Sequence, residues 1–195
     1  HWALIHGDKV TGVTIMKTSL KMDAGDIIRM RSTSIEDDEN LESLYERLSY
    51  LGRDLLLETI PTIVDGTAVY TKQDEEKVTF ALNVSKEDER IDFNKSNQDV
   101  YNLIRGLSPV PGAYCFLHSK RMKVYQAKID RHEYKGVPGE IVSVSSDSFT
   151  VLCGAGAIKF LNIGLEGKKR CLVKNFLNGV NHNELLGKVL NCEKE

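Results

Sequence analysis

The sequence has little cysteine, and the few cysteines that it has are widely spaced. Cys115, Cys153, Cys171 and Cys192 form no C-x-x-C pair. Their spacing argues against a zinc site or a disulfide framework and predicts a reducing, cytoplasmic location. The five histidines form no H-E-x-x-H motif, so no metal is expected. No apolar run approaches the roughly 18 residues of a membrane-spanning helix, so no membrane partner is expected.

The composition that remains is that of an ordinary globular protein, with 41% hydrophobic and 28% charged residues in a chain of 195. This length permits one or two domains with a real core. The net charge of −2 hides an asymmetry, because residues 1–90 hold 11 Lys and Arg against 18 Asp and Glu, whereas residues 91–195 hold 15 against 10. A basic second half hints at a polyanionic partner, although uneven sorting of solvated charges explains it equally well.

The first part of the chain has the pattern of an α/β layer. Residues 1–5 predict the end of a helix, closed by Gly7-Asp8, and residues 12–16 and 27–35 are rich in β-forming residues and predict strands. Apolar residues then recur at helical spacing and predict an amphipathic helix over residues 41–60 that packs on the sheet. Strands followed by a long helix suggest the end of an α/β layer domain.

The second part of the chain has the pattern of a small β-domain. Residues 66–90 are polar and predict a surface linker, and a short helix follows near residues 100–107. Strand-like runs, separated by Gly or Pro turns, then stand at residues 121–129, 140–144, 149–153 and 157–163. This spacing predicts a small antiparallel barrel or sandwich. A last short helix at residues 173–177 is expected to precede a polar tail.

The stretch KMDAGDII, at residues 21–28, places two acids around an Ala-Gly break. Its apolar neighbours suggest that both acids lie near a folded core, where an unpaired carboxylate is costly. From the residues alone, Asp23 is a turn residue, and Asp26 is interpreted as a brace for the entry into the strand. Gly25 is expected to allow a close backbone approach that a Cβ would block.

Several motifs resemble those of a known family. TGVTIM at residues 11–16 and MDAGDII at residues 22–28 resemble the formyltransferases that use 10-formyltetrahydrofolate. Four further stretches resemble the C-terminal domain of the methionyl-tRNA formyltransferases: KEDERIDF at 86–93, IRGLSPVPGAY at 104–114, MKVYQAKI at 122–129 and LEGKK at 165–169. The matches cover essentially the whole chain, in the order of the family.

The resemblance implies a fold in three parts. It places the C-terminal part of a Rossmann-like formyltransferase domain at residues 1–66, a linker at 67–86, and an OB-like antiparallel β-barrel that binds tRNA at 87–195. It also implies an enzyme that transfers a formyl group from 10-formyltetrahydrofolate, a co-substrate, to the amino group of methionyl-initiator-tRNA, which supports translation initiation. We expect a cytoplasmic monomer that holds no metal.

The resemblance also assigns roles to residues of the KMDAGDII stretch. Family members use an Asn, a His and an Asp together, and only the Asp carries over, onto Asp23. A carboxylate beside a histidine can orient the ring and stabilise its charged form. The resemblance therefore implies that Asp23 is catalytic and that Asp23 and Gly25 contact the folate. His1 is interpreted as a variable helical position and His6 as a surface residue, so the Asn and His are expected upstream of this chain, which alone would be inactive.

Six basic residues are interpreted as tRNA contacts. They are Lys168, Lys169 and Arg170 after Gly167, and Lys120, Arg121 and Lys123 beside another turn. Clustered cations on loops can contact phosphates without reading the sequence. This interpretation is favoured over a solvated turn for residues 168–170, whereas a solvated turn explains the other group equally well. Tyr114, Phe116 and Tyr125 could stack on bases, but their regular placement in strand-like runs favours core packing.

Two alternative functions stay open. The first is a folate-dependent formyltransferase or hydrolase with another acceptor, such as a nucleotide-sugar amine or water, because related extra domains occur in such proteins. The second is a non-catalytic RNA-binding fragment. The basic second half of the chain favours tRNA as the partner.

Overall fold

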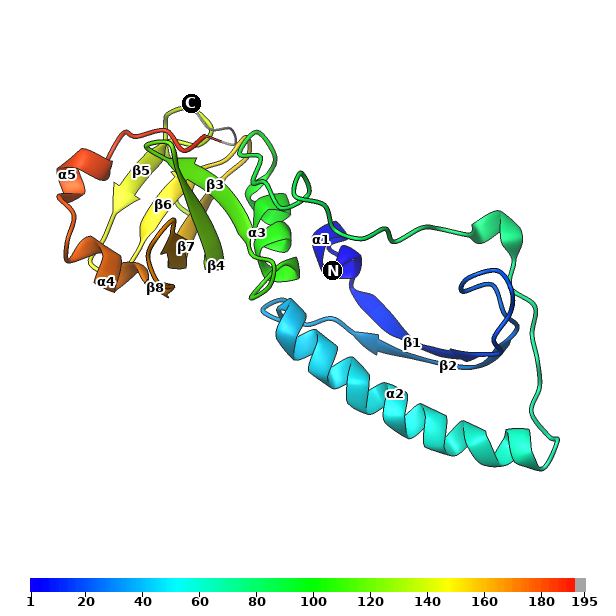
Figure 1. Cartoon of the computed structure of the whole chain (residues 1–195). Helices are drawn as coiled ribbons and strands as arrows, with labels where there is room; N and C mark the ends of the chain where they lie inside the picture. Colours follow the sequence, from blue (N-terminus) through cyan, green and yellow to red (C-terminus); the bar gives the residue numbers. More distant parts are fainter. Residues whose placement is uncertain (192–195) are drawn as a thin grey trace. The chain divides into compact units, whose positions relative to one another are not determined.

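The computed structural model describes residues 1–191 and divides the chain into two compact units. The hairpin–helix unit consists of Asp8–Leu82. The sheet unit joins His1–Gly7 to the chain from Asn83 onward (Figure 1). None of the helices within the described residues is long and apolar enough to cross a membrane.

The hairpin–helix unit consists of two antiparallel strands and a long helix. Strand β1 (Val10–Met16) pairs with β2 (Ile27–Ser34), and α2 (Leu41–Val64) runs along this hairpin (Figure 1). Helix α2 begins with a capping box. The Asn40 side chain accepts a hydrogen bond from the Ser43 amide, and the Ser43 hydroxyl accepts one from the Asn40 amide. The two strands and the helix are therefore confirmed, and the helix extends a turn beyond its expected end.

The sheet unit is built around one antiparallel sheet. Its strands are β3 (Ala113–Leu117), β4 (Lys120–Asp130), β5 (Ile141–Val144), β6 (Phe149–Leu152), β7 (Ala157–Leu165) and β8 (Cys171–Leu172). The order across the sheet is β3-β4-β7-β6-β5, with β8 paired to β7. The four strands that were expected with bounds correspond to β4, β5, β6 and β7. Strand β3 holds Tyr114 and Phe116, which were expected in strand-like runs without stated bounds, and β8 was not predicted. The core contains large side chains from several of these strands, including Phe149, Phe160 and Met122.

Short helices complete both units. They are α1 (Trp2–His6), α3 (Asn97–Gly106), α4 (Val173–Leu177) and α5 (His182–Leu185) in the sheet unit, and a 3₁₀ turn, η1 (Glu75–Lys77), in the hairpin–helix unit. Helices α3 and α4 confirm the two expected helices. Helix α5 lies in the stretch that was expected to be a polar tail.

The first helix packs within the sheet unit. The Nδ1 atom of His1 lies 3.0 Å from the carbonyl oxygen of Gly106 on α3. A Cβ on Gly106 would lie 2.8 Å from Cγ1 of Ile5, so the close approach of α1 and α3 requires a glycine there. The compact units therefore differ from the expected blocks, because α1 does not lie with the rest of residues 1–66 and residues 67–82 belong to the hairpin–helix unit.

The end of the described chain is not a free polar tail. Leu185 and Leu190 are buried. The Leu190 amide donates to the Gly139 carbonyl, and the Ile141 amide donates to the Lys188 carbonyl, beside β5. Asn191 and Phe116 of β3 exchange backbone hydrogen bonds of 2.8 and 3.2 Å. Residues 187–191 thus hydrogen-bond to both edges of the β3-to-β5 sheet, which corrects the expected tail.

Three cysteines of the described chain carry free thiols. Cys115 and Cys153 are buried in the sheet unit and Cys171 is partly exposed, whereas Cys192 lies outside the described residues. Burial raises the pKa of Cys153 to about 12 and raises that of Cys115 further above the ordinary value of a thiol. Both buried groups therefore behave as small apolar side chains.

Candidate functional site

The candidate catalytic residue lies on the loop between β1 and β2, here called the Asp23 loop (residues 17–26). The Lys17 amide donates to the Asp26 carbonyl across the base of this loop, with 2.9 Å between the atoms. A Cβ on the buried Gly25 would lie 1.6 Å from the Lys17 carbonyl oxygen. The expected close backbone approach at Gly25 is therefore confirmed, and any other residue would push the two ends of the loop apart.

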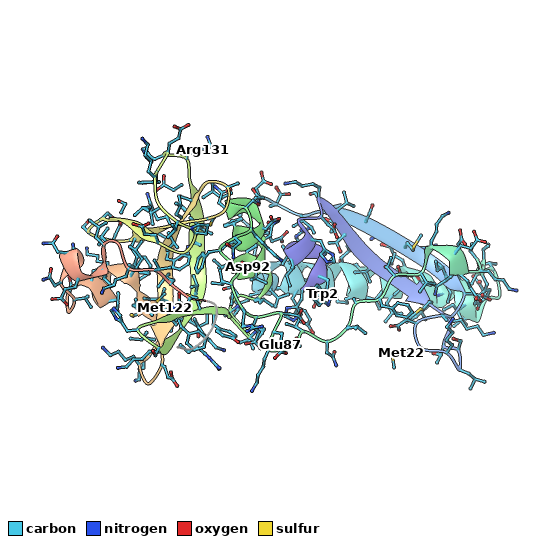
Figure 2. All side chains as sticks on the ribbon, turned by 90° about the horizontal axis from the view of Figure 1, so that it is seen from above. Trp2, Met22, Glu87, Asp92, Met122 and Arg131 are labelled. Atoms are coloured by element: carbon cyan, nitrogen blue, oxygen red, sulfur yellow. The ribbon has the colours of Figure 1, made fainter. Side chains whose placement is uncertain are left out.

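Asp23 has a backbone conformation that L-residues seldom adopt. Its φ is 52°, in the left-handed region, where Asp and Asn are enriched over other residues. The side chains around it are exposed, and Met22 lies on the part of the loop that extends beyond β1 and β2 (Figure 2). The expectation that apolar neighbours place Asp23 near a core is therefore wrong for this chain: the loop presents its carboxylate at the surface.

Asp26 and Gln73 hold the Asp23 loop through its backbone. Asp26 contributes its carbonyl oxygen, so the expected brace is made by the main chain. The Gln73 side-chain amide donates to the carbonyl oxygens of Asp23 and of Gly25, and both distances are 2.8 Å. Gln73 belongs to the stretch that was predicted to be a linker, and nothing in the local pattern of the sequence marks it.

The second candidate site lies in the sheet unit and is here called the basic sheet face. Its cations are Lys120, Arg121, Lys123, Lys168, Lys169 and Arg170. The Glu166 amide donates to the Arg121 carbonyl at 2.8 Å, and the Arg121 amide donates to a carboxylate oxygen of Glu166 at 3.1 Å. These bonds join the start of β4 to the turn after β7. The structure therefore brings the two predicted basic groups, residues 120–123 and 168–170, to neighbouring positions on one end of the sheet.

Arg170 stacks its guanidinium on the Tyr125 ring and is hydrogen-bonded to Asn162. Its guanidinium lies 4.5 Å from the centroid of the Tyr125 ring, and its Nε donates to Oδ1 of Asn162 at 3.0 Å. A Cβ on Gly112 would lie 2.9 Å from the Tyr125 ring, and one on Gly164 would lie 3.1 Å from it. The two glycines thus leave room for the flat ring that supports Arg170.

The other cations of this face differ in how firmly they are placed. The Arg121 guanidinium lies 4.6 Å from the centroid of the Tyr114 ring, and the Lys123 ammonium donates to the Pro111 carbonyl. Lys120, Lys168 and Lys169 are exposed and unpaired among the described residues. Tyr114 and Phe116 are buried, as core packing predicted, but they alternate with the β3 residues of the apolar core and form an edge-on pair beneath Arg121.

A polar cluster that the sequence did not reveal lies at the other end of β4. The buried Asp130 carboxylate accepts hydrogen bonds from the His132 ring and amide, the Tyr134 hydroxyl and the Thr150 hydroxyl. The Lys159 ammonium lies 3.7 Å away. Burial alone would raise the pKa of Asp130, but the hydrogen bonds from His132, Thr150 and Tyr134 outweigh it and hold this pKa well below its usual range.

A groove of about 640 Å³ lies in the sheet unit between α1 and residues 87–103. Trp2 and His6 of α1 line it, together with acids that include Glu87 and Asp92 (Figure 2). Asp92 accepts hydrogen bonds from Asn94, so this acid shapes the local turn. No group of three or more His, Cys, Asp or Glu within residues 1–191 is arranged to hold a metal ion.

Comparison with known families agrees with this arrangement of a formyltransferase-like loop and an antiparallel sheet. The family model described as "Formyl transferase, C-terminal domain" matches residues 83–181, and the model described as "Formyl transferase" matches residues 1–60. The first of these covers half of the chain. The chain therefore belongs to the formyl transferase family.

Individual proteins of known sequence or structure are also similar to this chain. The chain is 42% identical over 187 residues to the methionyl-tRNA formyltransferase of Streptococcus agalactiae, an alignment that covers 96% of this chain and 60% of the relative. It thus spans about three fifths of the length of that relative. Among solved structures, HypX from Aquifex aeolicus in complex with tetrahydrofolic acid matches with a TM-score of 0.70 and 21% identity, over 90% of this chain and 31% of that one.

A second solved structure carries the same name as the sequence relatives. Methionyl-tRNA formyltransferase from Clostridium thermocellum matches with a TM-score of 0.55 and 21% identity, over 67% of this chain and 56% of that one. At this level of identity, both structural matches show a shared fold. They are consistent with the antiparallel sheet of the sheet unit.

Proposed function

We propose that this chain is part of an enzyme that transfers the formyl group of 10-formyltetrahydrofolate to the amino group of methionyl-initiator-tRNA. The observation that carries the proposal is the 42% identity to a methionyl-tRNA formyltransferase over 96% of the chain. The Asp23 loop and the basic sheet face supply, within this chain, one candidate site for the chemistry and one for the polyanion.

In this proposal Asp23 is the catalytic carboxylate. Formyl transfer to an amine requires a neutral attacking nitrogen, donors for the oxyanion of the tetrahedral intermediate, and movement of a proton between the two nitrogens. A carboxylate can orient a neighbouring histidine or relay the proton through water. Gly25 lacks a side chain, which lets the loop close on Lys17. In this proposal the folate contacts the backbone of this part of the loop.

The basic sheet face is the proposed tRNA contact. Its six cations are Lys120, Arg121, Lys123, Lys168, Lys169 and Arg170, and together they present positive charge at one end of the sheet. Cations at such positions bind phosphates without reading the base sequence. We further propose that the sheet unit is an OB-like barrel; the hydrogen bonds from residues 187–191 to both sheet edges support this closure.

An acceptor screen with the full-length protein and 10-formyltetrahydrofolate tests the function. We expect methionyl-tRNA to be formylated and a 3-amino nucleotide sugar to stay unmodified. Hydrolysis of 10-formyltetrahydrofolate to formate is expected to be slow. Formylation of the sugar, or rapid hydrolysis, would replace the proposed acceptor. Binding of tRNA without turnover on any acceptor would favour the non-catalytic alternative.

Substitution of Asp23 by Asn tests the proposed site. We expect turnover to fall by about 100-fold or more, a loss typical of a removed proton-transfer group, while the affinity for tRNA stays unchanged. Asp26→Asn is the matched control, because Asp26 acts through its carbonyl, and it should retain turnover. Near-normal turnover in the Asp23→Asn variant would reject the assignment.

A further inference from the structure

Gln73 stands apart from the polar stretch in which it lies. Both of its chain neighbours, Lys72 and Asp74, are exposed, whereas Gln73 is half-buried. Its Nε2 atom donates to the carbonyl oxygens of Asp23 and Gly25 at 2.8 Å each. A side-chain amide carries two N–H donors, so this one nitrogen can make both bonds at once.

The two carbonyls that Gln73 binds belong to the residues on either side of Ala24. Fixing both of them sets the direction of the two peptide units that follow Asp23 and Gly25. This restraint acts where it is needed, because Asp23 has a φ of 52° and this left-handed conformation is uncommon for a residue with a side chain. The direction of the Asp23 carboxylate therefore depends on backbone that Gln73 holds.

Gln73 is itself anchored to the hairpin. Thr71 and Ile27 exchange backbone hydrogen bonds of 2.8 and 2.9 Å, which fasten the chain just before Gln73 to the start of β2. The Nε2 atom of Gln73 also lies 3.9 Å from the sulfur of Met16 at the end of β1. The donor thus comes from a segment about 50 residues away in the sequence that is hydrogen-bonded to the start of β2.

The base of the loop does not need Gln73. The bond between Lys17 and Asp26 and the close approach at Gly25 already join the two strands. The Gln73 bonds instead restrain the backbone of residues 23–25, between this base and the apex of the loop. We propose that Gln73 is a positioning residue that holds the Asp23 loop in its reactive conformation, a role that rests on the proposed catalytic function of Asp23.

The test compares three variants of the full-length protein in formylation of methionyl-tRNA. Gln73→Ala and Gln73→Glu both remove the donors, and we expect each to lower kcat by about 10- to 100-fold, the effect of misplacing a catalytic group by about 1 Å, without a change in KM for tRNA. Gln73→Lys supplies N–H donors on a side chain one bond longer and should recover part of the loss. Lys72→Ala, next to Gln73 and exposed, is the control and should match the wild type.

A double-mutant cycle with Asp23→Asn separates this proposal from the one on which it rests. If Gln73 acts through Asp23, Gln73→Ala should lower the residual kcat of the Asp23→Asn variant by less than twofold. A multiplicative loss in both backgrounds, or a kcat of Gln73→Ala within twofold of wild type, would overturn the role of Gln73. Unchanged turnover in Asp23→Asn alone would instead overturn the proposed function of Asp23.

Amide hydrogen exchange supplies a readout that does not depend on activity. Loss of the Gln73 donors should speed exchange of the Ala24 amide, which donates to the Lys21 carbonyl within the apex of the loop. The amides of β1 that face β2 should keep their protection. Unchanged exchange at Ala24 in Gln73→Ala would show that Gln73 does not restrain the loop and would reject the proposal.

Discussion

Asp130 offers the sharpest test of how the sheet unit is held together. Its side chain is 3% exposed, yet it carries a charge. Four hydrogen bonds of 2.7–3.1 Å reach its two oxygens, two from His132 and one each from Tyr134 and Thr150. Asp130→Asn keeps the shape of the side chain but replaces one acceptor oxygen by an NH₂ group that faces donors.

The loss of stability in Asp130→Asn depends on the hydrogen-bond donors that lose their acceptor. A hydrogen bond to a charged group contributes about 1.5–3 kcal/mol, and removing one partner of a buried network adds the cost of the unsatisfied remainder. Thr150 is buried at 2% exposure, so water cannot replace its lost partner. The Tyr134 hydroxyl can turn and accept instead. We expect Asp130→Asn to lower the free energy of unfolding by about 2–3 kcal/mol at pH 7.

The effect should depend on pH with a defined sign. The pKa of Asp130 is lower in the folded chain than in the unfolded chain, so its contribution to stability is complete above the unfolded pKa of about 3.9. This contribution is lost as pH falls through the folded pKa, because the folded carboxylate then takes up its proton. The difference between wild type and Asp130→Asn should be fully present at pH 7 and shrink below pH 4.

Urea unfolding followed by tryptophan fluorescence measures this difference. Trp2 is the single tryptophan of the chain and lies on α1, within the sheet unit that contains Asp130. Glu133→Gln is the control, since it removes the same charge from an exposed neighbour. A loss below about 0.5 kcal/mol, the range of ordinary surface substitutions, or a difference that persists unchanged to pH 2.5, would refute this account of the cluster.

Two further predictions concern the basic sheet face and the end of the described chain. Replacing Lys168, Lys169 and Arg170 together by Gln should weaken tRNA binding and lower the slope of log K against log salt by about 2, given about 0.7–0.9 per phosphate contact; an unchanged slope, or an equal change in a Lys86, Lys135 and Lys188 triple variant, would remove them from the interface. Leu190→Ala should lower the free energy of unfolding of the sheet unit by about 2–4 kcal/mol because it empties a buried site. The control, Val189→Ala, changes an exposed side chain and should lower the free energy of unfolding much less, as measured by urea unfolding. Equal losses in the two variants would show that Leu190 does not pack against the sheet.

The sequence identified elements whose signal is local. Strands β4 to β7 stand between Gly or Pro turns, and α2 repeats apolar residues at helical spacing, so neighbours in the sequence suffice to find them. Strand β3 received no bounds because its five residues, Ala113–Leu117, are all buried and show no alternation of polar with apolar residues. An apolar run of this length fits a buried strand and part of a helix equally well.

Contacts between distant residues explain the other departures. The polar stretch around Gln73 has the composition of a linker, and it reaches the Asp23 loop through the pairing of Thr71 with Ile27 and the hydrogen bonds of the Gln73 side chain. Leu185 and Leu190 each stand beside another apolar residue, Leu186 and Val189, in a polar stretch, so the local sequence does not mark which of each pair is core. The two basic groups were predicted separately, because their proximity depends on the register of β4 against β7, in which Lys123 lies opposite Gly164.

The aromatic rings beneath the two arginines suggest different roles for the arginines and the lysines of the basic sheet face. Arg121 and Arg170 are held on the rings of Tyr114 and Tyr125, so little side-chain freedom remains to be lost when a guanidinium binds an anion. The exposed lysines keep their freedom and add attraction that falls with salt. In the proposed tRNA complex, the two arginines therefore fix where phosphates lie, and the lysines increase the rate and strength of capture. Substituting Arg170 by Lys, which keeps the charge but loses the planar stack, should then weaken binding while leaving the salt slope unchanged.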